Sequence, residues 1–258
     1  MLYDDPRPIS LLTGHSAVEA ISKLSTNRLS VNKENNVDRA VVCDGSGRVL
    51  DAPHIVWDES GVILLHTTSY KPDYLKSVAR TLSKGSGQVM DATGAIDRFL
   101  CHRDQCPDQA GLVIDNLGVM GKYSIVLNPT RSEKWTNTRL TPEVLIEIGG
   151  LTDDHLKGRY LPHHIGLADY VRLDNGCYPG QEIHARMDSR NPNKKKMIWI
   201  EFEDPPNQNS LIISGFNCKF ITPSGGRIVH GIIEDSTEGG FHDTAIGTVN
   251  TLDILNAL

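Results

Sequence analysis

The chain has 258 residues, 39% of them hydrophobic, and carries a formal net charge of −6 from 26 Lys and Arg against 32 Asp and Glu. This hydrophobic share excludes a disordered chain and is enough for a sizeable core. The acidic balance argues against a general nucleic-acid coat, although a local basic strip could still contact RNA. No apolar run approaches the roughly 20 residues of a membrane span, and segment 1–8 is unlike a signal peptide. We therefore expect a globular, cytoplasmic protein with no membrane contact.

Helices and strands are predicted to alternate irregularly over the first half of the chain. Thr13 and Ser16 can cap a helix over residues 15–24, and Pro72 opens a second helix that Gly85 closes. Residues 48–57 and 62–67 predict a hairpin around the turn 58–61, and a turn is also predicted at 44–47. Further strands are predicted at 40–43, 89–90, 98–101 and 123–127, with a short helix near 109–117. This irregular order favours an α+β fold over a doubly wound sheet.

The second half of the chain predicts a change of architecture near residue 191. Thr141 and Pro142 begin a short helix that contains Glu147. The segment 191–193, Asn-Pro-Asn, is typical of a linker. Beyond it, short strands are predicted at 197–202, 211–214, 219–222, 227–233 and 245–249, which suggests a small barrel. We therefore expect a region 1–190 in one or two lobes and a C-terminal β-barrel domain 191–258.

Five scattered cysteines are present, and this odd, sparse set predicts reduced thiols in a cytosol-like compartment. They are Cys43, Cys101, Cys106, Cys177 and Cys218. Cys101 and Cys106 are the one close pair, but their spacing is wider than the usual two- to four-residue gap of a zinc site. The adjacent His163 and His164 point to opposite sides of an extended segment. We expect no metal site.

The stretch 175–182, Asn-Gly-Cys-Tyr-Pro-Gly-Gln-Glu, contains the densest polar chemistry in the chain. Glycines and a proline around Cys177 predict a tight loop that presents the thiol in a defined direction. A helix is predicted to follow, and its positive end would favour the thiolate, with Arg186 and Arg190 adding to the effect. A buried, structural cysteine is the alternative, since free cysteine commonly behaves as a small hydrophobe.

The same stretch resembles a known family. Residues 176–182 match the Gly-Cys-Tyr/Phe-x-Gly-Gln-Glu motif of the YgfZ-like proteins, folate-binding relatives of the glycine cleavage T-protein. Residues 161–167, Leu-Pro-His-His-Ile-Gly-Leu, are similar to the family's Leu-Pro-Gln-Glu-Ala-Gly-Leu. Segments 146–149 and 47–49 also fit the family pattern. Two positions depart from it: Asn175 replaces a Lys, and Leu145 replaces an Arg common in T-proteins.

The resemblance implies a T-protein-like folate-binding fold with a C-terminal small β-barrel, and tetrahydrofolate or a derivative as the cofactor. It implies that Cys177 is the catalytic centre and that a second set of residues binds the cofactor: Glu147, Tyr178, Gln181, Glu182 and Arg186. A carboxylate such as Glu147 suits a pterin because it accepts two hydrogen bonds from adjacent N–H groups. Most helical glutamates, in contrast, are simply solvated.

The function implied by the resemblance is an accessory role. Bacterial members assist iron–sulfur-dependent tRNA modification, and mitochondrial members assist iron–sulfur cluster assembly. The implied partners are reduced folate and iron–sulfur proteins, with weak or indirect contact to tRNA. Two alternatives stay open: a folate-dependent transferase of the aminomethyltransferase type, and a non-catalytic interaction module. A basic strip from His184 to Lys196 also suggests an anionic partner, although a solvated face explains such a strip equally well. The sequence does not indicate the oligomeric state or the client protein.

Overall fold

The structure is a computed structural model, and it has the mixed α+β composition that the sequence predicts. It describes residues 2–14, 16–27, 37–58, 61–82, 87–106, 112–117, 123–128, 137–147, 150–190, 194–213, 216–221, 226–234 and 247–250. The chain divides into two compact units. The first comprises Met1–Lys23, Leu29–Ala40 and Asp51–Thr152, and the second comprises Leu24–Arg28, Val41–Leu50 and Asp153–Leu258. Within the described ranges, no helix combines the length and apolar character that a membrane crossing needs.

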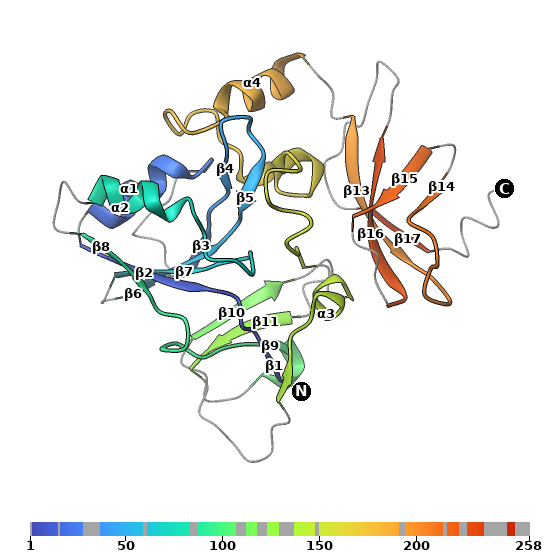
Figure 1. The fold of residues 1–258 in the computed structure, drawn as a ribbon, viewed down its shortest axis with the longest axis horizontal. Helices are drawn as coiled ribbons and strands as arrows, with labels where there is room; N and C mark the ends of the chain where they lie inside the picture. The colour runs from blue at the N-terminus through green and yellow to red at the C-terminus, as the bar shows by residue number, and fades with distance from the viewer. Residues whose placement is uncertain are drawn as a thin grey trace. The chain divides into compact units, whose positions relative to one another are not determined.

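The first unit contains an antiparallel sheet with two helices on one side (Figure 1). The strand order is β3 (Val37–Arg39), β6 (His54–Asp58), β7 (Gly61–Leu65), β2 (Ile9–Thr13) and β8 (Gln88–Asp91). The hairpin turn predicted at 58–61 is confirmed, since Asp58 pairs with Gly61. Helices α1 (Ser16–Leu24) and α2 (Leu75–Leu82) match the predicted helices, and Ile21 and Val78 are buried on their apolar stripes.

One predicted strand is split in two. The sequence predicts one strand over residues 48–57, but the structure has two, β5 (Val49–Asp51) and β6, separated by Ala52 and Pro53. Pro53 has no backbone N–H for a strand ladder, so the chain changes partner at this point. The strand β5 pairs with β4 (Val42–Cys43) instead, around the predicted turn.

A second sheet completes the first unit. Its strand order is β10 (Leu112–Leu117), β11 (Tyr123–Leu127), β9 (Arg98–His102), β1 (Leu2–Asp4) and β12 (Asn137–Arg139). The prediction of a helix near 109–117 is wrong, because residues 112–117 pair with β11. Leu112, Val113 and Ile114 pair with Leu127, Val126 and Ile125, and this pairing outweighs the local helix pattern. Apolar side chains from both sheets share one core that includes Ile9, Ile63, Leu100, Ile125 and Leu127. The predicted helix containing Glu147 is present as α3 (Pro142–Glu147).

The second unit ends in a five-stranded sheet (Figure 1). Among the described residues its strand order is β14 (Ser210–Ile213), β15 (Phe216–Phe220), β16 (Ile228–Glu234), β13 (Lys195–Glu201) and β17 (Gly247–Asn250). These strands follow the five that the sequence predicts, and Ile198, Ile200, Phe220 and Val229 form their core. Residues 153–258, which include this sheet, belong to one compact unit, and the domain boundary at residues 190 and 191 stays a prediction.

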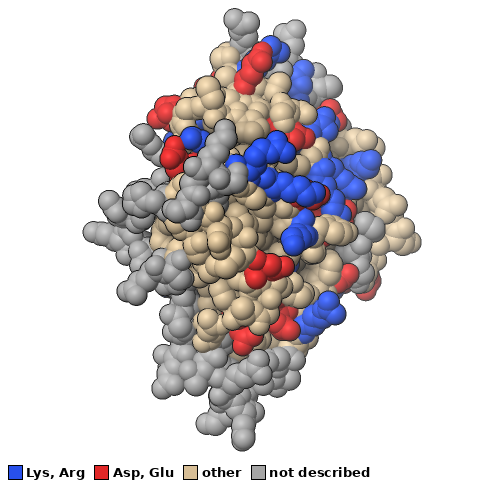
Figure 2. All heavy atoms as spheres, turned by 60° about the vertical axis from the view of Figure 1, so that its left-hand side comes forward, with Lys and Arg blue, Asp and Glu red and all other residues tan. Residues whose placement is uncertain are grey.

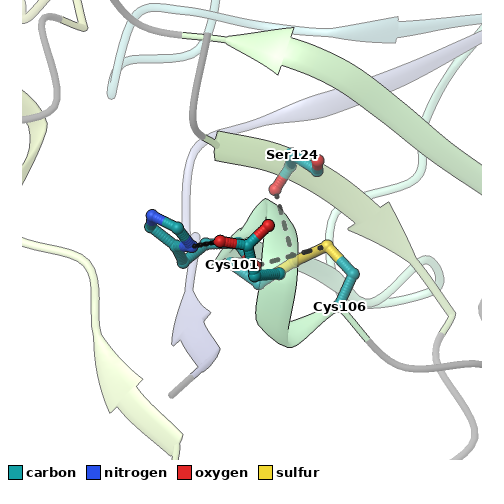
Figure 3. Close-up of a disulfide and its surroundings, with 5 residues drawn as sticks. Cys101, Cys106 and Ser124 are labelled. Atoms are coloured by element: carbon teal, nitrogen blue, oxygen red, sulfur yellow. Dashed lines mark hydrogen bonds and ion pairs between the residues drawn. A yellow bond between two sulfur atoms is a disulfide. The ribbon is translucent and has the colours of Figure 1, made fainter. Parts of the chain in front are cut away.

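The expectation that all five cysteines are reduced is wrong for one pair. Cys101 and Cys106 form a disulfide, shown in Figure 3, with their Cα atoms 5.8 Å apart. That separation is within the usual range for a disulfide. Cys101 lies in β9, and the single 3-10 turn η1 (Arg103–Gln105) brings Cys106 back beside it. Cys43, Cys177 and Cys218 are free, and only Cys177 of these three is exposed.

Candidate functional site

The Cys177 loop lies in the second unit and has the form that the sequence predicts. Gly176 and Gly180 bracket the loop, and their φ angles of 81° and 80° lie in the left-handed region that favours glycine. Helix α4 (Gln181–Arg190) begins directly after the loop. Cys177 is exposed, whereas Tyr178 is buried with 7% of its surface exposed. The loop is therefore anchored by its tyrosine and presents its cysteine to solvent.

Two glycines bring the loop against the turn of the β4–β5 ribbon. The backbone of Gly180 lies directly against that of Gly47, in the turn between Cys43 and Val49. His184 donates its Nε2–H to the carbonyl of Gly47 at 2.8 Å, because a carbonyl can only accept. Within the turn, Gly47 N–H donates to the Asp44 carbonyl at 2.9 Å. The segment 47–49 and the loop 176–182, which the sequence marks separately, thus form one structural element.

Two amide side chains hold the start of the loop. Asn175 donates its Nδ2–H to the carbonyl of Ser25 at 3.2 Å, and Gln181 donates its Nε2–H to the carbonyl of Leu173 at 2.9 Å. Asn175 therefore ties the loop to a distant segment at the position where the family resemblance places a Lys. Gln181, predicted to bind the cofactor, stabilises the loop in this structure.

Tyr178, His163 and His184 surround the base of the loop. The ring centroids of His163 and Tyr178 lie 5.7 Å and 5.8 Å from that of His184. Burial raises the pKa of Tyr178 to about 12, with a smaller contribution from Cys43. Burial also lowers the pKa of His163 to about 4 and lowers that of His184. At neutral pH this cluster is uncharged, because both imidazoles are neutral and the phenol keeps its proton.

Two of these side chains have unused hydrogen-bonding atoms. Among the described residues, His184 Nδ1 and Tyr178 Oη are buried without a hydrogen-bond partner. Since His184 carries its hydrogen on Nε2, Nδ1 is an acceptor, and the Tyr178 hydroxyl is a donor. An acceptor and a donor thus lie behind the loop that presents Cys177.

The basic strip expected from His184 to Lys196 is wrong at His184, which is fully buried and neutral. Arg186 forms an ion pair with Glu182 one helical turn away, and Lys195 Nζ lies 3.5 Å from Glu234 Oε2. Figure 2 shows several Lys and Arg side chains gathered on one part of a face, with Asp and Glu side chains beside them. Surface pairs of this kind contribute little to stability, and they offset the charge of two cations of the strip, Arg186 and Lys195.

Glu147, the residue expected to face a pterin, belongs to the first unit. It is the last residue of α3, and its side chain lies outside the described part of the structure. Leu145, two residues earlier, is 8% exposed and joins the core between the two sheets. An apolar residue therefore fits this position, where T-proteins commonly have an arginine.

The first unit also contains a buried polar network that the sequence did not predict. Asp5 Oδ2 lies 2.7 Å from both Arg7 Nη2 and Arg98 Nε. Burial would raise the pKa of Asp5, but the two guanidinium groups hold it below its usual value. The network continues through Arg98, whose Nη1 donates to the carbonyl of His66 at 2.8 Å. Charged residues are rarely buried unless they are paired. The sequence around Asp5, Arg7 and Arg98 indicates neither that they are buried nor that they pair.

The chain has a mixed α+β fold, as the sequence predicts, and its similarity to a solved structure shows that this fold is T-protein-like. Among solved structures, the chain is similar to the glycine cleavage system aminomethyltransferase T from Bartonella henselae, with a TM-score of 0.66 and 10% identity. The match covers 90% of this chain and 78% of that chain. At this identity the similarity shows the fold alone, and the YgfZ-like subfamily stays a prediction.

A second solved structure is the heterotetrameric sarcosine oxidase from Corynebacterium sp. U-96, with 15% identity and a TM-score of 0.32. That match covers 50% of this chain and 75% of the oxidase chain, too weak to define a shared fold. No protein-family model matches the sequence. No curated protein matches it either.

Proposed function

We propose that this chain is a tetrahydrofolate-binding accessory protein that assists iron–sulfur proteins, with Cys177 as its functional centre. The observation that carries the proposal is the exposed Cys177, presented by a glycine-bracketed loop within a T-protein-like fold. A structural cysteine would be buried, as Cys43 and Cys218 are. The iron–sulfur clients, including tRNA-modifying enzymes, come from the family resemblance of residues 176–182.

Folate binding is tested first, by calorimetry of the full chain with tetrahydrofolate. Glu147→Ala should weaken binding by roughly 10- to 100-fold, because a hydrogen bond to a charged group contributes about 1.5–3 kcal/mol. Glu143→Ala is the matched control, since Glu143 is an exposed carboxylate in the first turn of the same helix. Equal affinity of the two variants and the parent chain for tetrahydrofolate would show that Glu147 does not contribute to folate binding. The absence of any binding would favour an interaction module that uses the fold without folate.

The accessory role is tested in a strain that lacks the gene. Cys177→Ser should bind tetrahydrofolate like the parent chain but should not restore the activities of iron–sulfur enzymes or the levels of modified tRNA nucleosides. Cys218→Ser is the control for loss of a thiol, because Cys218 is a buried cysteine of the C-terminal sheet. Full restoration by Cys177→Ser would exclude a functional role for this thiol.

The alternative function is that of a tetrahydrofolate-dependent aminomethyltransferase, which the similarity to aminomethyltransferase T favours. It is distinguished by incubating the chain with an aminomethylated lipoyl carrier and tetrahydrofolate. Formation of methylenetetrahydrofolate and ammonia would support the transferase. No turnover, together with measurable folate binding, would support the accessory role.

A further inference from the structure

A serine, a histidine and an aspartate form a hydrogen-bonded chain in the buried network of the first unit. Ser10 Oγ lies 2.8 Å from His66 Nε2, and His66 Nδ1 lies 2.7 Å from Asp51 Oδ2. The three residues lie in or next to different strands, β2, β7 and β5. Their surfaces are 5%, 0% and 1% exposed for Ser10, His66 and Asp51. This connectivity is the one that activates a serine hydroxyl in hydrolases of unrelated folds.

The hydrogen bonds around Asp51 fix where each proton lies. Its Oδ1 accepts the backbone N–H groups of Ala52, Thr67 and Thr68 at 2.8, 3.0 and 3.3 Å. All three contacts on Oδ1 are accepted from N–H donors, which is the arrangement expected of a carboxylate. Burial raises the pKa of Tyr74 far above its usual value, so its hydroxyl stays protonated, and it donates to Asp51 Oδ2 at 3.4 Å.

The tautomer of His66 follows from this arrangement. A carboxylate at 2.7 Å from Nδ1 requires the hydrogen on Nδ1. In the neutral ring, Nε2 then carries the lone pair and accepts the hydroxyl hydrogen of Ser10. The serine thus points its proton at a base that a carboxylate holds in the correct orientation.

We propose that Ser10 is a nucleophile for acyl transfer from small, uncharged carboxylic esters, with His66 as its base and Asp51 as the residue that positions His66. Ser10 Oγ attacks the ester carbonyl carbon while its proton passes to His66 Nε2. The C–O bond to the alcohol breaks, and the departing alcohol takes that proton from Nε2. Water then attacks the acyl-serine with the same base, which releases the carboxylic acid and restores Ser10. This activity is independent of the proposed folate and Cys177 function.

The charge balance of the network favours an uncharged substrate. Its two carboxylates, Asp5 and Asp51, are matched by the guanidinium groups of Arg7 and Arg98. Burial lowers the pKa of Arg98 to about 10, which leaves it charged at neutral pH. A charged substrate group would therefore enter a buried site with no partner, at a cost of several kcal/mol. With Ser10 only 5% exposed, the substrate must also be small.

The test is covalent labelling of the full chain with diisopropyl fluorophosphate, a small, uncharged reagent that phosphorylates activated serines. The expected result is one adduct on the peptide that contains Ser10, with loss of hydrolysis of p-nitrophenyl acetate. Ser10→Ala should abolish the adduct. Ser124→Ala should keep the adduct, because Ser124 is a fully buried serine of the same unit outside the hydrogen-bonded chain of Ser10, His66 and Asp51.

A second variant separates catalysis from a structural role. His66→Ala should lose labelling, and added imidazole should restore part of it by replacing the missing base. A purely structural histidine would give no such rescue. The proposal is overturned if the folded parent chain, checked by circular dichroism, shows no adduct on Ser10. It is also overturned if Ser10→Ala is labelled to the same extent as the parent.

Discussion

Replacing Gly180 with alanine should destabilise the second unit by about 2–5 kcal/mol, the largest effect expected for any single methyl group in the Cys177 loop. Two causes add. The φ of 80° at residue 180 is unfavourable for an L-residue by roughly 1–2 kcal/mol. The new methyl carbon would also lie 2.8 Å from the Asp44 carbonyl oxygen and closer still to the Gly47 backbone. Overpacking of this kind costs typically about 1–3 kcal/mol.

Gly176 provides a matched control on the other side of Cys177. Its φ is 81°, nearly the same as that of Gly180, but a methyl group there would have nothing within 4 Å. Gly176→Ala should therefore show the backbone cost alone, about 1–2 kcal/mol. The difference between the two variants isolates the contact between the loop and the Gly47 turn.

The assay is urea denaturation followed by circular dichroism, with the free energy of unfolding compared between the two variants and the parent chain. Alkylation of Cys177 provides a local measure, because a displaced loop should change the rate at which its thiol reacts. Equal losses of stability in Gly176→Ala and Gly180→Ala would refute the reasoning. That result would mean that the loop does not depend on its contact with Gly47.

Three further predictions concern the same unit. The free energy of unfolding should fall by about 2–3 kcal/mol between pH 6.5 and pH 4, because the fold lowers the pKa of His163 from 6.5 to about 4 and the unfolded chain therefore binds the proton first. Denaturation of His163→Gln should show a flatter pH dependence of this free energy. An equal pH dependence in the variant and the parent chain would contradict the prediction. Brief iodoacetamide treatment at neutral pH should label Cys177 ahead of Cys43 and Cys218. Burial raises the pKa of both buried thiols, and it raises that of Cys218 to about 12. Peptide mapping that finds more label on Cys218 than on Cys177 would contradict this prediction. Cys177→Ser should change the free energy of unfolding by less than about 0.5 kcal/mol, as for other exposed substitutions, and a larger loss would indicate a packing role.

The parts of the fold that local chemistry determines could be predicted from the sequence. The turn at residues 58–61 and the glycine-bracketed loop around Cys177 follow from residues that lie next to one another. The sequence predicts a helix where the structure has the strand β10 (Leu112–Leu117), because short apolar segments fit either element. Its pairing with β11 decides the outcome, and a local pattern contains no information about that partner.

Features that join distant residues could not be predicted. The relay of Ser10, His66 and Asp51 forms only when three strands meet, and each residue alone resembles an ordinary surface position. His184 looked like part of a basic strip because its neighbours in the sequence are cationic. Its burial depends on the turn at Gly47, far away in the chain. The disulfide joins residues only five positions apart, Cys101 and Cys106, but it depends on one 3-10 turn, which cysteine spacing alone does not specify.

The contact between Gly47 and Gly180 has a consequence for genetics as well as for structure. In a saturation screen scored by the function of Cys177, the ribbon turn between Cys43 and Val49 should show the same intolerance as the loop itself. A geneticist who mapped loss-of-function alleles would find them in two separate segments of the gene, although the two segments form one contact in the folded chain. Because no residue is smaller than glycine, a substitution at Gly47 should not be suppressed by a substitution at Gly180, and the double variant should be at least as defective as either single variant.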